Sequence, residues 1–598
     1  MKSYKDIVYR MSIVLLSALR LLLQSRLPVF GRPVNSDDDM LMVSYADSIR
    51  HGAWLGGYKY STLEKFPGQG ILLAVSDWAG LPYMLTLGLM WLGASLVLLC
   101  ALRRWKVNRW AALISFAVVV FSPVMLYTHS QRLYCLASVA PTVLALASSF
   151  LAIMAPPDRD SGPVWPYVLV AAVSAAFYSV LRQDAVWVLL MTLAFAAVAA
   201  VVAVVRFRVS GREPRRLLAA LVCAVLPVLS FLAASFALAR VNGAVYGVRV
   251  KSDFTEGGFA RACLALMSIR PEEEKPKVYV QESVLDMACR HSPTLNRLKA
   301  TLDGRRGRNR AGKLPDGEWE REYYAWYLRW SASDVGVYAN GAVGADRFFS
   351  AVADEICDAI DGGRMERRNA ILLSPFTGPM TLARFKSIFV HSLRCGAVDT
   401  VSFKGMKPAY VESDVKRKVA ADNLAIMEDI SHSDIPSRPL CSVSRVWQNR
   451  YKAGVAAGTG IAKVYMCLGR TIAVAAMAVF VAGWIFLLSC PRCRRDATTW
   501  SVMAFATVAL GSFWMVLFIV SANFFEVRPD STQAAYTPGA VVMFHLFSLG
   551  SLILVPACIS RCFPGHDGGM SVGSLMKKFV AYVRGKWLKT APVAVPQA

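Results

Sequence analysis

The chain has 598 residues, of which 55% are hydrophobic, and its mean hydropathy is +0.41. This composition excludes an ordinary soluble protein. The net charge of +25 would suit a nucleic-acid partner, but no basic motif interleaved with aromatic residues supports nucleic-acid binding.

Ten apolar segments have the length of about 20 residues that a bilayer-spanning helix requires. They lie near residues 7–24, 81–102, 110–127, 133–154, 164–181, 185–205, 217–240, 466–489, 500–520 and 536–557. The sequence therefore predicts an all-α polytopic membrane protein with about ten transmembrane helices. The first segment has no clean cleavage site after it, which favours a retained anchor over a signal peptide.

Basic residues in short loops indicate which ends of these helices face the cytoplasm. If the N-terminus is cytoplasmic and all ten segments cross, five basic clusters fall inside: Lys2 and Lys5; Arg103, Arg104, Lys106 and Arg109; Arg206, Arg208, Arg212, Arg215 and Arg216; Arg492, Arg494 and Arg495; Lys577, Lys578, Arg584, Lys586 and Lys589. Both termini are then expected in the cytoplasm. Anionic membrane lipids are the expected neighbours of these clusters.

This topology divides the chain into three regions. Residues 1–240 form a seven-span block whose first outer loop covers residues 31–80. Residues 241–463 form a hydrophilic, extracytoplasmic segment that is predicted to be mostly helical, with helices over 342–360 and 380–393. Residues 464–598 form a three-span block with a basic cytoplasmic tail.

The first outer loop opens on three consecutive acids, Asp37, Asp38 and Asp39. They have three interpretations. They can cap the helix that follows and stabilise its positive end. One of them can be a general base, because mutual repulsion and a low-dielectric interface both raise a carboxyl pKa. Two of them can also hold a divalent cation, so the sequence leaves the metal and any cofactor open.

Three cations fall on the same predicted outer face: Lys65, Arg132 and Arg182. Each one alone is typical of an interfacial anchor. Together with the acids they predict an acid/base site beside a cationic pocket of phosphate size.

These residues occur in segments that resemble a known family. Asp38-Asp39-Met40-Leu41-Met42 is similar to the Asp-Asp-x-Leu-Phe opening of an uncharacterised bacterial branch of GT-C-type glycosyltransferases. The stretch from Thr62 to Gly68 resembles the Thr-Leu-x-Lys-Gly-Pro-Gly of that branch. The stretches from Gln131 to Tyr134 and from Leu181 to Trp187 resemble its Arg-x-Tyr-Arg and Thr-Arg-Glu-Glu-Gly-x-Trp signatures. The resemblance covers the first 275 residues well and the rest loosely.

The resemblance implies an inverting glycosyltransferase of a bacterial cytoplasmic membrane. In the wider GT-C clan, which includes polyprenyl-phosphate mannosyltransferases and the aminoarabinose transferases of lipid A, an Asp of the first outer loop deprotonates an acceptor hydroxyl. That hydroxyl attacks the anomeric carbon of a polyprenyl-phosphate sugar. Asp38 and Asp39 occupy the matching positions, and Asp37 is an additional acid. The matched motifs also supply the expected substrate- and phosphate-binding residues, which are Lys65, Arg132, Tyr134, Arg182 and Asp184.

The expected partners are a polyprenyl-phosphate sugar donor, membrane lipids, and an envelope glycan, lipid or protein acceptor. A transporter or flippase for lipid-linked glycans is the alternative from another class. Ion-coupled transporters place ionisable residues at mid-membrane, and most of the ten segments carry none at their centres. A non-catalytic partner in envelope synthesis is the third interpretation.

Overall fold

The computed structural model describes residues 2–34, 37–157, 162–210, 214–308, 312–410, 421–435, 445–524 and 533–561. Helices are the only extended regular elements in these ranges, which otherwise contain isolated β-bridges. The predicted all-helical class is therefore confirmed. Asn35, Ser36, Arg212 and the basic C-terminal tail, to which the sequence predictions also refer, lie outside the described residues.

The N-terminal block contains nine α-helices and two short 3₁₀ turns among the described residues. Their bounds are α1 Lys2–Gln24, α2 Asp38–Arg50, α3 Gly68–Trp78, α4 Tyr83–Arg104, α5 Arg109–Val120, η1 Pro123–Met125, η2 Thr128–Gln131, α6 Leu136–Ile153, α7 Trp165–Leu181, α8 Val186–Ser210 and α9 Pro214–Tyr246.

The hydrophilic segment is helical as predicted. Its elements are α10 Gly257–Met267, α11 Glu282–His291, α12 Pro293–Asn296, α13 Lys299–Arg308, α14 Tyr323–Asp334, η4 Val337–Asn340, α15 Gly341–Asp361, α16 Leu382–Arg394, the π-helical η5 Cys395–Thr400, and α17 Ala421–Ser431. The predictions for 342–360 and 380–393 correspond to α15 and α16. The helix α15 ends where the sequence places Gly362 and Gly363.

The C-terminal block begins inside the predicted hydrophilic segment, because α18 is a single helix over Arg445–Ser489. It continues with α19 Pro491–Arg495, α20 Ala497–Phe524, α21 Gln533–Tyr536, α22 Pro538–Leu549, the π-helical η7 Gly550–Leu554 and α23 Val555–Arg561.

Seven helices of the described ranges are long and apolar enough to cross a membrane. They are Tyr83–Arg104, Leu136–Ile153, Val186–Arg208, Pro214–Tyr246, Gln448–Ser489, Ala497–Asn523 and Pro538–Ile559. The other three predicted segments also coincide with helices, namely α1 and the shorter apolar helices α5 and α7. The chain is thus a multi-pass helical membrane protein.

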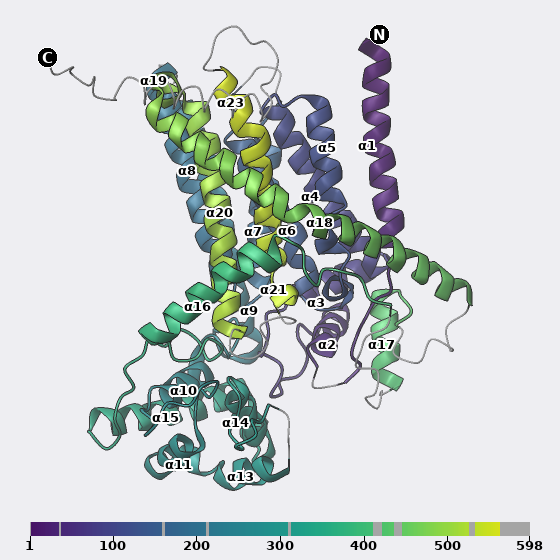
Figure 1. Ribbon diagram of the computed structural model, residues 1–598. Coiled ribbons are helices and arrows are strands. Elements are labelled where there is room, and N and C mark those ends of the chain that lie inside the picture. Colours follow the sequence, from purple (N-terminus) through teal and green to yellow (C-terminus); the bar gives the residue numbers. More distant parts are fainter. Residues whose placement is uncertain are drawn as a thin grey trace, which may run out of the picture.

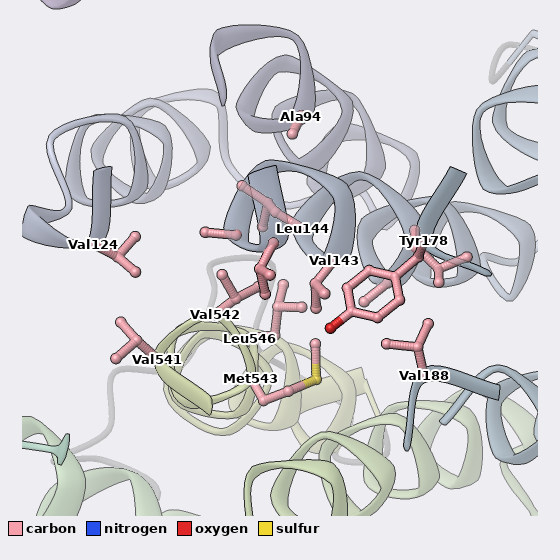
Figure 2. Packing of buried hydrophobic residues seen from close by; sticks show 14 of the residues in the cluster. Ala94, Val124, Val143, Leu144, Tyr178, Val188, Val541, Val542, Met543 and Leu546 are labelled. Atoms are coloured by element: carbon pink, nitrogen blue, oxygen red, sulfur yellow. The ribbon is translucent and has the colours of Figure 1, made fainter. Parts of the chain in front are cut away.

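The helices α6 and α22 form the centre of the bundle. Nearly every residue of α6 is buried, and α22 is buried over most of its length. Figure 2 shows Val143 and Leu144 of α6 next to Val542 and Leu546 of α22, with Tyr178 of α7 pointing towards this contact. Small residues such as Ala140, Ala147 and Ala540 line both helices, which lets the backbones approach closely.

The hydrophilic segment has a separate apolar core from Phe254 to Met365, built mainly by α10, α11, α14 and α15. This part lies at one end of the bundle, and the N-terminus and α19 lie at the other end (Figure 1). Later residues of the same segment, including Phe403 and Met427, pack into the main bundle core instead. The short helices α2 and α3 lie at the end of the bundle that faces the hydrophilic part (Figure 1).

Candidate functional site

Asp37, Asp38 and Asp39 lie at the start of α2. Asp37 is the N-cap residue, and its Oδ1 accepts a hydrogen bond from the backbone N–H of Asp39 at 3.3 Å. Asp38 and Asp39 occupy the first turn, where the helix dipole favours negative charge. The capping role is therefore present, and the capping hydrogen bond holds the Asp37 carboxylate at the start of the helix.

A short backbone pairing brings Arg132 to this helix start. Phe30 and Arg132 form a parallel β-bridge, in which the Phe30 N–H donates to Gln131 and the Leu133 N–H donates to Phe30. The pairing carries the Arg132 guanidinium to Asp39, with Nη2–Oδ2 at 2.8 Å and Nε–Oδ2 at 3.1 Å.

Arg132 also contacts Asp37, the N-cap residue of α2. Its Nη2 lies 3.2 Å from Asp37 Oδ1, and Arg32 Nη1 lies 3.5 Å from Asp37 Oδ2. Asp39 is fully buried. Asp37 and Asp39 therefore hold the loop together through Arg132, and neither carboxylate is open to a substrate.

Asp38 differs from its two neighbours. Its carboxylate is the most exposed of the three, at 36%, and its Oδ1 lies 3.5 Å from Lys65 Nζ. The Lys65 ammonium also lies over the rings of Trp326, at 5.5 Å, and Phe376, at 5.9 Å. Burial alone would lower the pKa of Lys65, but attraction to Asp38 and Glu64 outweighs burial and raises this pKa. Lys65 is thus a charged amine between an accessible carboxylate and an aromatic cover.

Contacts from three regions fix the loop that carries Lys65. The Tyr45 hydroxyl of α2 donates to the Thr62 carbonyl at 2.9 Å. The Glu64 carbonyl accepts from Gln183 Nε2 at 2.6 Å and from the Ser252 hydroxyl at 3.0 Å. Gln183 belongs to the α7–α8 hairpin and Ser252 to the start of the hydrophilic segment, so the Glu64 carbonyl connects the membrane bundle to the hydrophilic segment.

Gly68, the first residue of α3, allows this loop to approach α7. A Cβ at Gly68 would lie 2.6 Å from the Val180 carbonyl oxygen and 2.7 Å from Leu181 Cα. Both contacts are with backbone, which cannot rotate away.

We expect Gly68→Ala to destabilise the protein by about 1–3 kcal/mol, as overpacking does in a close-packed interior. Thermal unfolding in detergent measures this loss. Gly93→Ala in α4 is the matched control, since a Cβ there meets nothing within 4 Å. That control should be unchanged or slightly more stable, because Ala favours the helix. Equal melting temperatures for the two variants would contradict the proposed close contact.

Arg182 and Asp184 form a bidentate ion pair in the α7–α8 hairpin, with Nε–Oδ1 at 2.8 Å and Nη2–Oδ2 at 2.6 Å. The Arg182 guanidinium lies 5.7 Å from the centre of the Tyr536 ring. Both charged residues line a narrow cavity, which is otherwise mostly apolar, between α6, α7, α20 and α22. Arg182 therefore reaches the site with its charge already balanced by Asp184.

Tyr536, in α21, is close enough to the predicted site residues for their charges to affect the pKa of its hydroxyl. Burial raises the pKa of this hydroxyl, and Asp38 adds to the rise. Three cations act in the opposite direction: Arg182, Lys65 and Arg132. Burial and Asp38 likewise raise the pKa of Tyr134, whose ring lies 5.9 Å from the Arg132 guanidinium. Residues from separate parts of the chain thus meet around α21 and the start of α2.

Glu64 is a buried carboxyl group beside this site. Burial raises its pKa from the usual 4.5 to about 7, although Lys65 and Arg329 oppose the shift. The folded protein therefore keeps a proton on Glu64 at pH values where the unfolded chain has lost it. Its stabilising contribution is fully present below about pH 4.5 and is lost as the pH rises through about 7.

We expect Glu64→Gln to be more stable than the wild type at pH 8 and close to it at pH 5, because Gln never ionises. The difference between these two pH values should be on the order of 3 kcal/mol. Thermal unfolding of both proteins at each pH gives the measurement. Glu366→Gln is the control, since Glu366 is exposed and should show no such pH dependence. A pH-independent difference for Glu64→Gln would contradict the raised pKa.

Sequence reasoning missed Tyr536, Trp326 and Phe376. Tyr536 is the first residue of the last predicted span, so a position at the end of a helix could be expected for it, but nothing in its neighbours marks a site. Trp326 and Phe376 belong to the hydrophilic segment, and only the fold brings their rings to Lys65.

The residues that the structure describes include no group of three or more His, Cys, Asp or Glu side chains that could hold a metal ion. Within the acid cluster, Arg32, Arg132 and Lys65 already face the three carboxylates. Comparison of the chain with family models, curated proteins and solved structures finds no match.

Proposed function

We propose that this protein is an inverting, GT-C-like glycosyltransferase that transfers a sugar from a polyprenyl-phosphate donor to an envelope glycan, lipid or protein acceptor. The observation that supports the proposal is the pairing of one accessible carboxylate, Asp38, with a cation that is only 16% exposed, Lys65, at the end of a membrane bundle. A lipid-borne phosphate presents its charge at this level of the bilayer.

Such a reaction requires a base for the acceptor hydroxyl and a cation for the leaving phosphate, and the neighbouring residues suit both requirements. Asp38 is a base with room for a hydroxyl, whereas Asp37 and Asp39 are held by Arg132. Lys65 lies at 3.5 Å from its acid, a longer contact than the 2.6 Å between Arg182 and Asp184, so a phosphate can compete for the ammonium. Arg182, paired with Asp184, lies 5.7 Å from the centre of the Tyr536 ring and completes the polar surroundings of that hydroxyl.

In the proposed step, the Asp38 carboxylate takes the proton of the acceptor hydroxyl as the hydroxyl oxygen attacks the anomeric carbon. The bond between this carbon and the phosphate oxygen breaks, and polyprenyl phosphate leaves with the electron pair. Attack opposite the leaving group inverts the configuration. Lys65 stabilises the negative charge of the departing phosphate.

The same proposal includes a topology. We infer that α1, α5 and α7 cross the bilayer together with the seven longer helices, giving ten spans in a bacterial cytoplasmic membrane. Both termini then face the cytoplasm, and residues 31–80 and most of the hydrophilic segment face outwards. The basic loops of the sequence support this orientation.

Purified protein in proteoliposomes tests the reaction. The vesicles contain a panel of polyprenyl-phosphate donors with radiolabelled sugars, and an envelope extract supplies the acceptors. We expect the label to become covalently attached to an acceptor while polyprenyl phosphate is released. Movement of intact donor across the bilayer would instead indicate a flippase. Absence of both transfer and movement with every donor would favour a non-catalytic partner.

A further inference from the structure

The helix α16 exposes a stripe of apolar side chains on the surface of the protein. The stripe consists of Leu382, Phe385, Phe389, Val390 and Leu393, which are between 40% and 72% exposed. Their spacing of three, four and seven residues places them on one side of the helix. The protein covers these side chains only in part, so the exposed apolar surface of the stripe requires another partner.

The opposite side of α16 packs on the end of a membrane-spanning helix. Arg384 Nη2 donates to the Ala522 carbonyl of α20 at 3.3 Å, and His391 Nδ1 lies 3.2 Å from the Ser521 hydroxyl. Phe385, at one edge of the stripe, also reaches this helix, and its ring lies 5.3 Å from that of Phe518. These contacts involve only the last turns of the span Ala497–Asn523, so α16 lies where that span leaves the bilayer (Figure 1).

The charge of α16 complements an anionic lipid surface. The helix contains three basic residues, Arg384, Lys386 and Arg394, and no acidic residue. Lys386 and Arg394 are exposed. Lys386 lies three or four residues from Leu382, Phe389 and Val390 and therefore projects from within the stripe, whereas Arg394 lies at its edge. Long basic side chains that carry their charge from an apolar face to the headgroups are typical of helices that lie in the plane of a membrane interface.

A hairpin that leads into α16 extends the apolar surface and connects it to the candidate site. Ile371 and Met380 pair through two backbone hydrogen bonds, and Ile371 and Leu373 are strongly exposed. The same hairpin carries Phe376, which lies over Lys65 at 5.9 Å and stacks on Phe254 at 5.0 Å. The hairpin therefore joins α16 to one ring that covers Lys65.

We propose that α16 is an interfacial helix whose apolar stripe lies in the outer lipid leaflet, with Lys386 and Arg394 at the level of anionic headgroups. The occupant of this surface is the bilayer itself, because the helix is packed on the end of a spanning helix and carries only positive charge. This placement anchors the hydrophilic part to the membrane beside Lys65. It does not depend on the reaction proposed above.

Site-specific photocrosslinking tests the proposal on the full chain. One protein carries p-benzoylphenylalanine at the position of Phe389, in the stripe, and a second carries it at the position of Ser387, on the polar side of the same helix. Both are reconstituted in nanodiscs of phosphatidylcholine and phosphatidylglycerol, irradiated and digested. We expect phospholipid adducts on the peptide of the first protein at a level at least fivefold above those of the second. The position of Val390 replaces that of Phe389 if the first protein does not fold.

The outcomes separate the possible occupants. Crosslinks from the position of Phe389 to another part of this chain or to a second copy would overturn the proposal, as would the absence of any lipid adduct there or equal lipid adducts from both positions. The charge is tested with Lys386→Glu and Arg394→Glu combined in the first protein. We expect the ratio of phosphatidylglycerol to phosphatidylcholine adducts to fall to the ratio in the bilayer. An unchanged excess of phosphatidylglycerol would overturn the assignment of these two residues to the headgroups.

Discussion

We expect Asp38→Asn to reduce the turnover number of sugar transfer by about 10²–10⁴-fold, the range that a general base contributes. The amide keeps the shape of the carboxylate and cannot take the proton of the acceptor hydroxyl. The protein should fold normally, because the Asp38 side chain is more than one third exposed and Asp37 provides the helix cap. Steady-state kinetics with a polyprenyl-phosphate donor give the measurement.

Asp47→Asn is the control for this variant. Asp47 lies on the same helix and pairs with Arg50 at 3.0 Å, outside the site. It should retain wild-type turnover, whereas Asp38→Glu should recover part of the lost activity. Turnover within twofold of the wild type for Asp38→Asn would remove Asp38 from the reaction and leave it as a partner of Lys65.

The helices could be predicted because the bilayer restricts the backbone so strongly. A segment in lipid must satisfy its own hydrogen bonds, so a long apolar run such as that of α4 or α20 has one structure available to it. Length was harder to judge for α5. The predicted segment runs to residue 127, whereas the helix ends at Val120, because hydropathy does not distinguish the apolar turn that begins at Phe121 from a helix.

The members of the candidate site could be proposed from the sequence because charged residues are rare beside apolar segments. Asp38, Lys65, Arg132 and Arg182 stood out for this reason. The sequence could not predict which of the three acids is exposed and which two pair with Arg132. This arrangement depends on the pairing of Phe30 with Arg132, which spans about one hundred positions of the chain and leaves Asp38 as the exposed carboxylate.

The aromatic cover of Lys65 could not be predicted either. Trp326 lies in α14 and Phe376 in a hairpin, and each of these elements is placed by its own core contacts, such as those of both rings with Phe254. No local pattern encodes a contact between parts of the chain that are separated by more than 250 residues. In the sequence, Trp326 and Phe376 cannot be distinguished from aromatic residues that only pack in a buried core.

The largest expected loss of stability concerns Arg132. This residue is the shared partner of Asp39, which is fully buried, and of Asp37, which is 11% exposed. Removal of one member of a buried ion pair leaves an uncompensated charge in a medium that solvates it poorly, at a cost of about 3–5 kcal/mol. The loop that carries the acids would lose its attachment to η2 at the same time.

We therefore expect Arg132→Met to lower the free energy of unfolding by about 3–5 kcal/mol, measured by denaturant unfolding in detergent micelles. Arg261→Met is the control, because Arg261 and Asp354 form a pair in which both side chains are more than half exposed, and such pairs contribute about 0–1 kcal/mol. Combining Arg132→Met with Asp39→Asn should cost less than the sum of the two single changes, since the second change removes the charge that the first leaves unpaired. Strict additivity would show that Asp39 and Arg132 stabilise the loop independently, and the acid cluster would then lack the fixed geometry on which a base at Asp38 depends.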